Sequence, residues 1–261
     1  MILATNAYAM KRPFKVVIDP GHGGVDRGTV FQNGAKRVTE KDMTLAIAKL
    51  VTRKLKASGI QTVLTRSTDI EVPLAERTAI ANRIGADVFI SIHMNSTPPS
   101  ANSRERGGEG VETYILNNAT DASSKRLAHL ENKVLGGHAA DSPDHNMDVA
   151  LILKDLRLDA NMSESKRLAC TIQDQLSQTT SKLSLGNRGV KQSLFHVLLG
   201  ADMPSVLVEA GFLSSARDRE LIQSDRGRAL VSSAIANAVE EFKRAKSTRE
   251  ALLKLSRCKV N

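Results

Sequence analysis

The chain has 261 residues, 41% of them hydrophobic, and its 37 Lys plus Arg against 28 Asp plus Glu give a formal net charge of +9. This length supports one sizeable core, and no linker-like stretch divides it, so we predict a single domain. No apolar run approaches the ~20 residues that cross a bilayer, and aromatic residues are sparse (3%, no Trp). We therefore expect neither a membrane span nor a nucleic-acid-binding surface, and the charge favours a carboxylate-bearing or polyanionic partner.

Residues 1–14 are predicted to be a tail outside the core. The opening MILATNAYAM has an Ala-x-Ala pattern but no basic segment before it, which is consistent with a disordered tail or with the remnant of a processed export segment. Residues 247–261 are expected to form a second tail. Cys170 and Cys258 have no CxxC neighbour, so by themselves they indicate neither a metal site nor a redox compartment.

The first half of the chain alternates predicted strands and helices, which indicates a mainly parallel sheet. In chain order these elements are strand 15–19, the glycine-rich loop GHGGVDRG, helix 39–58, strand 60–64, helix 73–84, strand 88–92 and strand 111–116. The helices are predicted from apolar residues at helical spacing, and each ends at a glycine. The stretch between the glycine-rich loop and the first helix is expected to be a long loop.

The second half begins with a segment, residues 121–184, that is too long for an ordinary crossover. It contains the helix-like stretches 123–135, 147–156 and 163–183 and is predicted to be a helical insertion. Strands 190–192 and 205–209 and the amphipathic helix 226–246 follow. We therefore expect an α/β domain over residues 15–246, built on a mainly parallel, twisted sheet of about six strands flanked by helices.

Four side chains suited to metal binding or proton transfer stand at the ends of these elements. His22 follows a strand in VVIDPGHGG, Glu40 opens a helix in RVTEKDM, His93 ends the strand in DVFISIHMN, and Glu209 ends the strand in SVLVEAGF. Open α/β sheets present such positions to a ligand crevice. Two imidazoles and a carboxylate fill three positions of a zinc tetrahedron and leave one for water. The pattern predicts a hydrolytic zinc site with Glu209 as proton shuttle.

Taken singly, these residues have ordinary structural explanations. Glu40 alone is a first-turn carboxylate that the helix dipole favours by ~0.3–1 kcal/mol, and His22 alone would be a surface histidine in a flexible glycine loop. Their joint placement favours a functional site. Asp19 is expected either to orient a ligand histidine or to cap a turn, and Asn95 starts the polar loop after His93. Surface or packing roles are expected for the remaining histidines, which are His129, His138, His145 and His196.

At these residues the chain closely resembles the zinc-dependent N-acetylmuramoyl-L-alanine amidases of the Amidase_3 type. The resemblance runs over nearly all of residues 16–245, through VVIDPGHGGVDRG, TEKD, TR-STD with LAERTAIAN, ADVFISIHMNS, RGVKQ and MPSVLVEAGFLSS. It implies one zinc ion per chain, held by His22, Glu40 and His93, with Glu209 as the catalytic glutamate. The implied reaction is hydrolysis of the amide that joins N-acetylmuramic acid to L-alanine in peptidoglycan.

The resemblance extends to a subgroup that separates daughter cells, in which an inserted helix lies across the active site. RLAHLENKVLGG resembles that helix, and Glu131 matches the carboxylate that takes the open zinc position; a solvated helix face is the alternative for Glu131. A LytM-type activator and a periplasmic or cell-envelope location are implied as well. Two other functions remain open, a zinc peptidase that cuts within the stem peptide and a noncatalytic wall-binding module.

Overall fold

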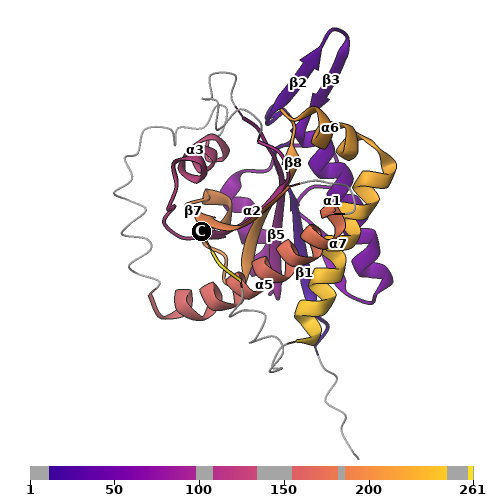
Figure 1. Cartoon of the computed structure of the whole chain (residues 1–261). Coiled ribbons are helices and arrows are strands. Elements are labelled where there is room, and N and C mark those ends of the chain that lie inside the picture. Colours follow the sequence, from indigo (N-terminus) through magenta and orange to yellow (C-terminus); the bar gives the residue numbers. More distant parts are fainter. Residues whose placement is uncertain (1–11, 98–107, 134–154, 182–185, 246–257, 261) are drawn as a thin grey trace, which may run out of the picture.

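A six-stranded sheet forms the centre of the computed structural model, which describes residues 12–97, 108–133, 155–181, 186–245 and 258–260 (Figure 1). The strands lie in the order β4-β1-β5-β8-β6-β7. Their bounds are β1 Lys15–Pro20, β4 Gln61–Leu64, β5 Val88–Asn95, β6 Val111–Leu116, β7 Asn187–Ser193 and β8 Ser205–Phe212. Strands β4, β1, β5 and β8 are mutually parallel, whereas β6 pairs antiparallel with β8 and parallel with β7. The prediction of a mainly parallel, six-stranded sheet is confirmed.

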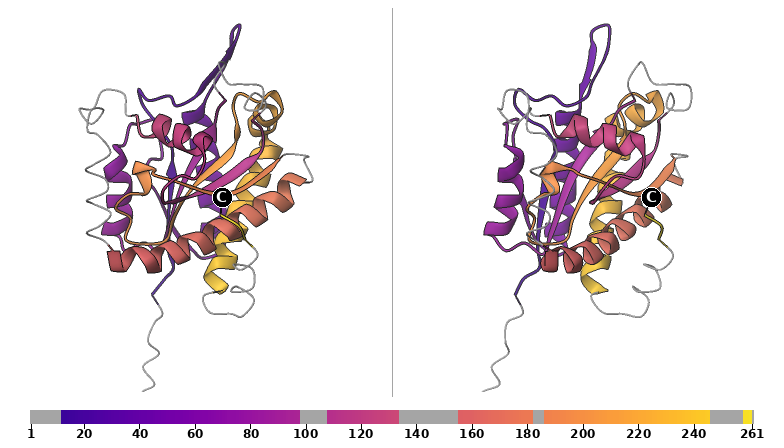
Figure 2. Two further views of the ribbon diagram at one scale, coloured as in Figure 1. Left: turned by 60° about the vertical axis from the view of Figure 1, so that its left-hand side comes forward. Right: turned by 90° about the vertical axis from the view of Figure 1, so that its left-hand side faces the viewer.

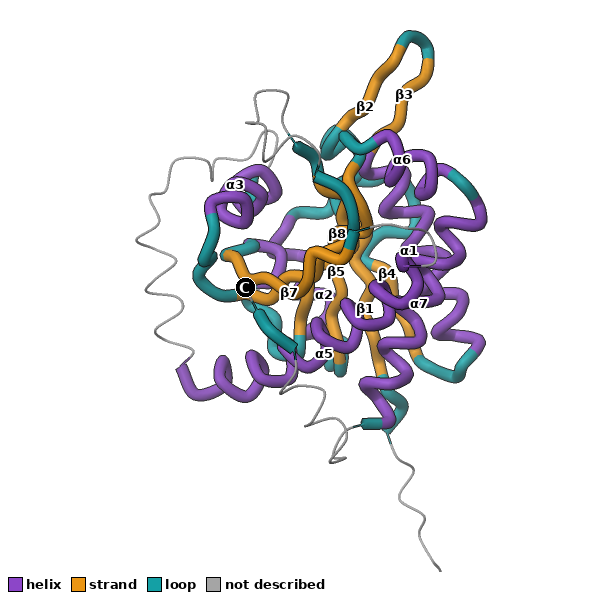
Figure 3. Tube along the Cα trace, in the orientation of Figure 1, coloured by secondary structure: helices purple, strands orange, loops and turns teal. Residues whose placement is uncertain are grey.

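Helices cover both faces of this sheet, and Figures 2 and 3 show the strands enclosed between them. The helices are α1 Glu40–Ala57, α2 Leu74–Arg83, α3 Ala122–Glu131, α5 Asp155–Ser181, α6 Ala216–Gln223 and α7 Asp225–Arg244, with a 3₁₀ turn, η1, at His196–Leu198. The larger core cluster joins one face of the sheet to α1, α5 and α7. A smaller cluster joins the other face to α2, α3 and η1.

Strand β5 illustrates how the sequence sorts residues between these two faces. Successive side chains of a strand point to opposite sides, so Ile90, Ile92 and Met94 enter the larger core while Phe89 enters the smaller one. His93 shares the face of Phe89. All eight residues of β5 are buried, as expected for a strand covered on both sides. His93 therefore lies on the α2 and α3 side of the sheet.

A two-stranded hairpin projects from the body where a loop was expected (Figure 1). It consists of β2 Val30–Asn33 and β3 Lys36–Thr39, paired antiparallel. Asn33 pairs with Lys36, so the two-residue turn consists of Gly34 and Ala35, and Gly34 has φ +57°. A glycine at the first position of a two-residue hairpin turn is typical of type II′ turns, because that position requires positive φ. Gly34 was therefore the signal that could have predicted the hairpin.

The segment 121–184 is not one insertion. Leu168, Ile172 and Leu176 of α5 are fully buried in the larger core, and α5 packs against α7 and β6. Helix α5 is therefore a core helix of the domain, and it is continuous through residues that were expected to separate two helices. Apart from α5, the described helix of the predicted insertion is α3. Residues 134–154, which include most of the expected helix 147–156, lie outside the described residues.

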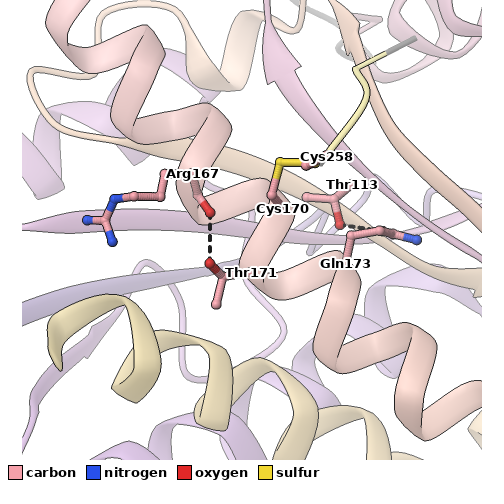
Figure 4. The surroundings of a disulfide bond; sticks show 6 residues. All are labelled: Thr113, Arg167, Cys170, Thr171, Gln173 and Cys258. Carbon is pink, nitrogen blue, oxygen red and sulfur yellow. Dashed lines mark hydrogen bonds between the residues drawn. A yellow bond between two sulfur atoms is a disulfide. The ribbon is translucent and has the colours of Figure 1, made fainter. Parts of the chain in front are cut away.

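Both predicted tails include residues that belong to the folded domain. Phe14 is buried in the larger core. At the other end, Cys258 forms a disulfide with Cys170 of α5 (Figure 4), and Val260 pairs with Val190 beside β7. Residues 1–11 and 246–257 lie outside the described residues. Among the described helices, none combines the length and the apolarity that a membrane span requires.

Candidate metal centre and active site

His22 is held toward the site by an unusual backbone conformation and by one carboxylate. It stands two residues after the end of β1 and has φ +59°, a left-handed conformation that costs a non-glycine residue roughly 1–2 kcal/mol. Its Nδ1 lies 2.8 Å from Oδ2 of Asp26, whose other oxygen accepts the backbone N–H of Gly28. With Nδ1 engaged, Nε2 is left to face the site.

Glu40 is the first residue of α1 and is fully buried. Its Oε1 accepts the backbone N–H of Met94 at 2.9 Å, and its Oε2 accepts that of Thr29 at 2.8 Å. These bonds fix the carboxylate between the glycine loop and β5. A Cβ at Gly28 would lie 2.5 Å from the His22 ring and 2.6 Å from Glu40 Oε2, so only glycine fits where the loop passes the site.

The three predicted metal ligands converge, together with Glu131. One ligand atom from each of His22, Glu40, His93 and Glu131 lies within 4.8 Å of the others. Oε1 of Glu40 is 3.0 Å from Nε2 of His22 and 3.1 Å from Nδ1 of His93. Oε2 of Glu131, at the end of α3, is 2.8 Å from Nδ1 of His93 and 3.2 Å from Nε2 of His22. Four side chains from separate elements thus point at one small volume.

The donor atoms of this cluster fit a cation. Nε2 of His22, Oε2 of Glu131 and both carboxylate oxygens of Glu209 are buried and form no hydrogen bond with the described residues. Buried polar atoms without partners are costly, and three buried carboxylates facing two imidazoles carry surplus negative charge. A divalent ion would satisfy these atoms, and imidazole nitrogen with carboxylate oxygen is a donor set that zinc accepts.

Glu209 lies beside the cluster on the next strand. It pairs with His93 in the β5–β8 register, so the two side chains share a face of the sheet at the ~4.8 Å spacing of adjacent strands. Burial, followed by the carboxylates of Glu131 and Glu40, raises the pKa of Glu209 well above its usual range. A carboxyl group with a raised pKa and no hydrogen-bond partner is suited to proton transfer near neutral pH.

The imidazoles respond to the same charges. Burial opposes protonation of His93, but Glu131 and Glu40 outweigh it and raise the pKa of His93 to about 9. Burial likewise favours the neutral form of Glu40, yet His22 and His93 hold the pKa of Glu40 below its usual range. Without a metal ion, protons on the imidazoles balance the negative charge of the carboxylates.

Asp19 does not orient a histidine by any hydrogen bond of the described residues. It is fully buried and accepts hydrogen bonds from Thr65, Ser91 and Arg77. The histidine-orienting contact that was suggested for Asp19 is made by Asp26 to His22 instead. The turn after β1 is short, and it brings Asp26, four residues after His22, back toward the ring.

Two buried arginines hold the backbone that carries His22, and sequence reasoning did not single them out. Arg66 donates to the carbonyls of Pro20 and Gly21, the latter at 2.8 Å. Arg77 donates to the carbonyls of Pro20 and His22 at 2.9 and 3.0 Å. Three consecutive carbonyls are thereby fixed, with Asp19 as a counter-ion 2.8 Å from Arg77.

Asn95, expected near the site, points past β8 toward strand β6. Its Nδ2 donates to Oε1 of Glu112, and its own Oδ1 accepts the backbone N–H of Ser96. Glu112 lies opposite Glu209 in the β6–β8 register. His129 is exposed on α3 and His196 begins η1; neither belongs to the metal-competent cluster found among the described residues. His138 and His145 lie outside those residues.

The cluster lies at the carboxyl ends of β1 and β5, with an unpartnered carboxylate beside it, and this arrangement defines a hydrolase-type centre on an α/β fold. Residues 16–241 match the family model described as N-acetylmuramoyl-L-alanine amidase, Amidase_3. The chain is 34% identical over 233 residues to the amidase AmiA of Escherichia coli, covering 87% of this chain and 75% of that protein. It is also 34% identical over 237 residues to AmiC of Neisseria meningitidis, covering 89% of this chain and 53% of AmiC.

Solved structures agree with this assignment. The N-acetylmuramoyl-L-alanine amidase from Clostridium difficile 630 aligns with a TM-score of 0.65 and 28% identity, over 91% of this chain and all of that one. The chain therefore belongs to the N-acetylmuramoyl-L-alanine amidase family and is a hydrolase of peptidoglycan. The expected family and reaction are confirmed.

Proposed function

We propose that the chain hydrolyses the amide between N-acetylmuramic acid and L-alanine with one zinc ion held by His22, Glu40 and His93. A bound zinc ion would supply Lewis-acid polarisation of the scissile carbonyl and would acidify a water molecule. The observation that carries the proposal is the convergence of these three side chains beside Glu209, whose buried oxygens have no hydrogen-bond partner among the described residues.

Each residue then has a distinct task. Glu209 accepts the proton of the attacking water and returns it to the leaving amine of the alanine, because its raised pKa allows both steps near neutral pH. Asp26 fixes the ring orientation of His22 through Nδ1. The backbone N–H groups of Met94 and Thr29 hold the carboxylate of Glu40 in place.

We propose further that α3 keeps the resting enzyme inactive. Glu131 closes α3 and brings Oε2 within 2.8 Å of His93 and 3.2 Å of His22, where it would take the coordination position that water needs. The apolar attachment of α3 is small: Leu127 and Ala128 are its buried apolar side chains, worth about 2–4 kcal/mol together. A binding partner could offset a cost of that size.

The partner proposed here is a LytM-type activator that displaces α3 during daughter-cell separation. The proposed location is the periplasm or cell envelope. The Cys170–Cys258 disulfide supports this location because such bonds persist in oxidising compartments. A net charge of +9 is also suited to a wall whose stem peptides carry carboxylates.

The reaction is tested by metal analysis and product identification on one preparation. Protein purified without chelator is expected to contain one zinc per chain and to release intact stem peptides that begin with L-alanine. Glu209→Gln is expected to retain the zinc and to lose turnover. Shortened peptides would instead indicate the stem peptidase, and a preparation with neither zinc nor hydrolysis would indicate the wall-binding module.

The inhibitory role of α3 is tested by Glu131→Ala, with His129→Ala on the same helix as a matched control. We expect Glu131→Ala to release peptide from purified peptidoglycan without any partner, at a rate at least about tenfold above that of the unaltered chain. The reason is that removal of the Glu131 carboxylate frees the zinc coordination position for water. His129 is exposed, so its replacement should change nothing. Equal basal rates for all three proteins would refute self-inhibition. A deletion variant must spare α5, because α5 is part of the core.

A further inference from the structure

A second charged cluster lies on the same face of the sheet as the metal centre. It consists of Glu112 on β6 with Arg188 and Lys191 on β7, and we call it the β6–β7 cluster. Oε2 of Glu112 is 2.9 Å from Nε of Arg188 and 2.7 Å from Nζ of Lys191. Glu112 also stands opposite Glu209 in the β6–β8 register. Residues directly opposite each other in an antiparallel pair place their side chains on one face.

The carboxylate of Glu112 is fully used inside the protein. Its Oε1 accepts hydrogen bonds from Asn95 and from the hydroxyl of Tyr114, and its Oε2 faces both cations. Two cations of β7 face this one carboxylate, and Lys191 also interacts electrostatically with Asp121.

Arg188 is the member that can reach a ligand. Its side chain is 33% exposed, compared with 1% for Glu112 and 11% for Lys191. Only its Nε is used in the hydrogen bonds of the described residues, and its guanidinium lies over the ring of Phe212 at 5.0 Å. The ring and Glu112 hold the plane of the guanidinium. These contacts do not use its terminal N–H groups. Such groups form the fork that binds carboxylates in two parallel hydrogen bonds.

We propose that Arg188, positioned by Glu112 and Phe212, binds a free carboxylate on the second residue of the stem peptide. This inference rests on the proposed amidase function. Arg188 stands on β7, two strands from Glu209 on β8, which is ~9.6 Å at the ~4.8 Å spacing of adjacent strands. Two residues of extended peptide span at most ~7 Å, and the long side chain of Arg188 covers the remaining distance. A carboxylate on the second residue can thus reach Arg188 while the amide ahead of the alanine lies at Glu209.

The test uses two soluble disaccharide-peptide substrates that differ at one group, a free α-carboxylate or its amide on the second stem residue. We expect kcat/KM for the acid to exceed that for the amide by about 10- to 100-fold, the range for hydrogen bonds to a charged group. Arg188→Gln should lower kcat/KM for the acid to the level of the amide and leave the amide within about threefold. Measurements are made on the full chain with and without Glu131→Ala.

Two further variants separate recognition from folding and from net charge. Arg188→Lys keeps the charge but loses the fork, so it should retain only part of the preference for the acid. Arg217→Gln removes the same charge from an exposed position of α6, and it should retain the full preference for the acid. Equal kcat/KM for both substrates in the unaltered chain, or an undiminished preference in Arg188→Gln, would overturn the subsite. Failure of every variant to cleave either substrate would refute the amidase function itself.

Discussion

Removal of the disulfide between Cys170 and Cys258 is expected to cost the protein a large part of its stability. The two cysteines are 88 residues apart in the sequence. For a loop of that length, the chain-entropy relation gives about 4.6 kcal/mol at 25 °C, and measured values typically fall at 2–4 kcal/mol. Domains have a free energy of unfolding of about 5–15 kcal/mol, so we expect Cys258→Ser to lower that free energy by about 2–4.5 kcal/mol.

Urea unfolding followed by far-ultraviolet circular dichroism measures this change. Cys258→Ser is the cleaner variant, because Cys170 is buried on α5 and a serine there would also place a hydroxyl in the core. The matched control is the unaltered chain in reductant, which should unfold at the midpoint of Cys258→Ser. A loss below about 1 kcal/mol would refute the reasoning, as would a difference between the two proteins that persists in reductant.

Two predictions concern the metal centre. Asp26→Asn should weaken zinc binding by roughly 10- to 100-fold, because the ring of His22 loses its charged partner; a competition titration with a chromophoric chelator measures this, and unchanged affinity would remove Asp26 from the site. The pKa of His93 is raised to about 9 in the metal-free protein, above its unfolded value of ~6.5. The stability this contributes is complete below pH ~6.5 and is lost as the pH rises through about 9. Thermal melts of chelated protein should therefore fall over that window, whereas a flat profile would contradict the assignment.

Local sequence patterns were sufficient for most of the elements and for the residues that form the candidate metal cluster. A buried strand such as Val88–Asn95 is recognised from its run of mainly apolar residues. A polar residue near the end of such a strand is therefore conspicuous. His93 and Glu209 could be recognised for this reason. His22 and Glu40 could be recognised because a glycine loop and a helix start mark their positions. The convergence of His22, Glu40 and His93 then follows from the rule that parallel strands end at one edge of a sheet.

The supporting residues could not be recognised in the same way. Asp26 contacts the ring of His22, and Arg66 and Arg77 hold the backbone at and just before His22, through contacts that span up to 55 residues. Charged residues are expected on the surface, and no local pattern distinguishes an arginine that is buried on distant carbonyls from one that is solvated. Their roles emerge only when β1, β4 and α2 are packed together.

Local patterns were also insufficient to place the segment 121–184 and to pair the cysteines. Amphipathic spacing correctly indicated helices there, but it is equally compatible with a helix laid over a site, such as α3, and with one that covers a sheet, such as α5. Likewise, Cys170 and Cys258 become partners only because α5 and the residues beside β7 meet. Sequence by itself therefore determined most of the elements and which side chains stand at their ends. Tertiary structure decided which of those elements are neighbours, because pairing across a fold depends on contacts between residues that are distant in the chain.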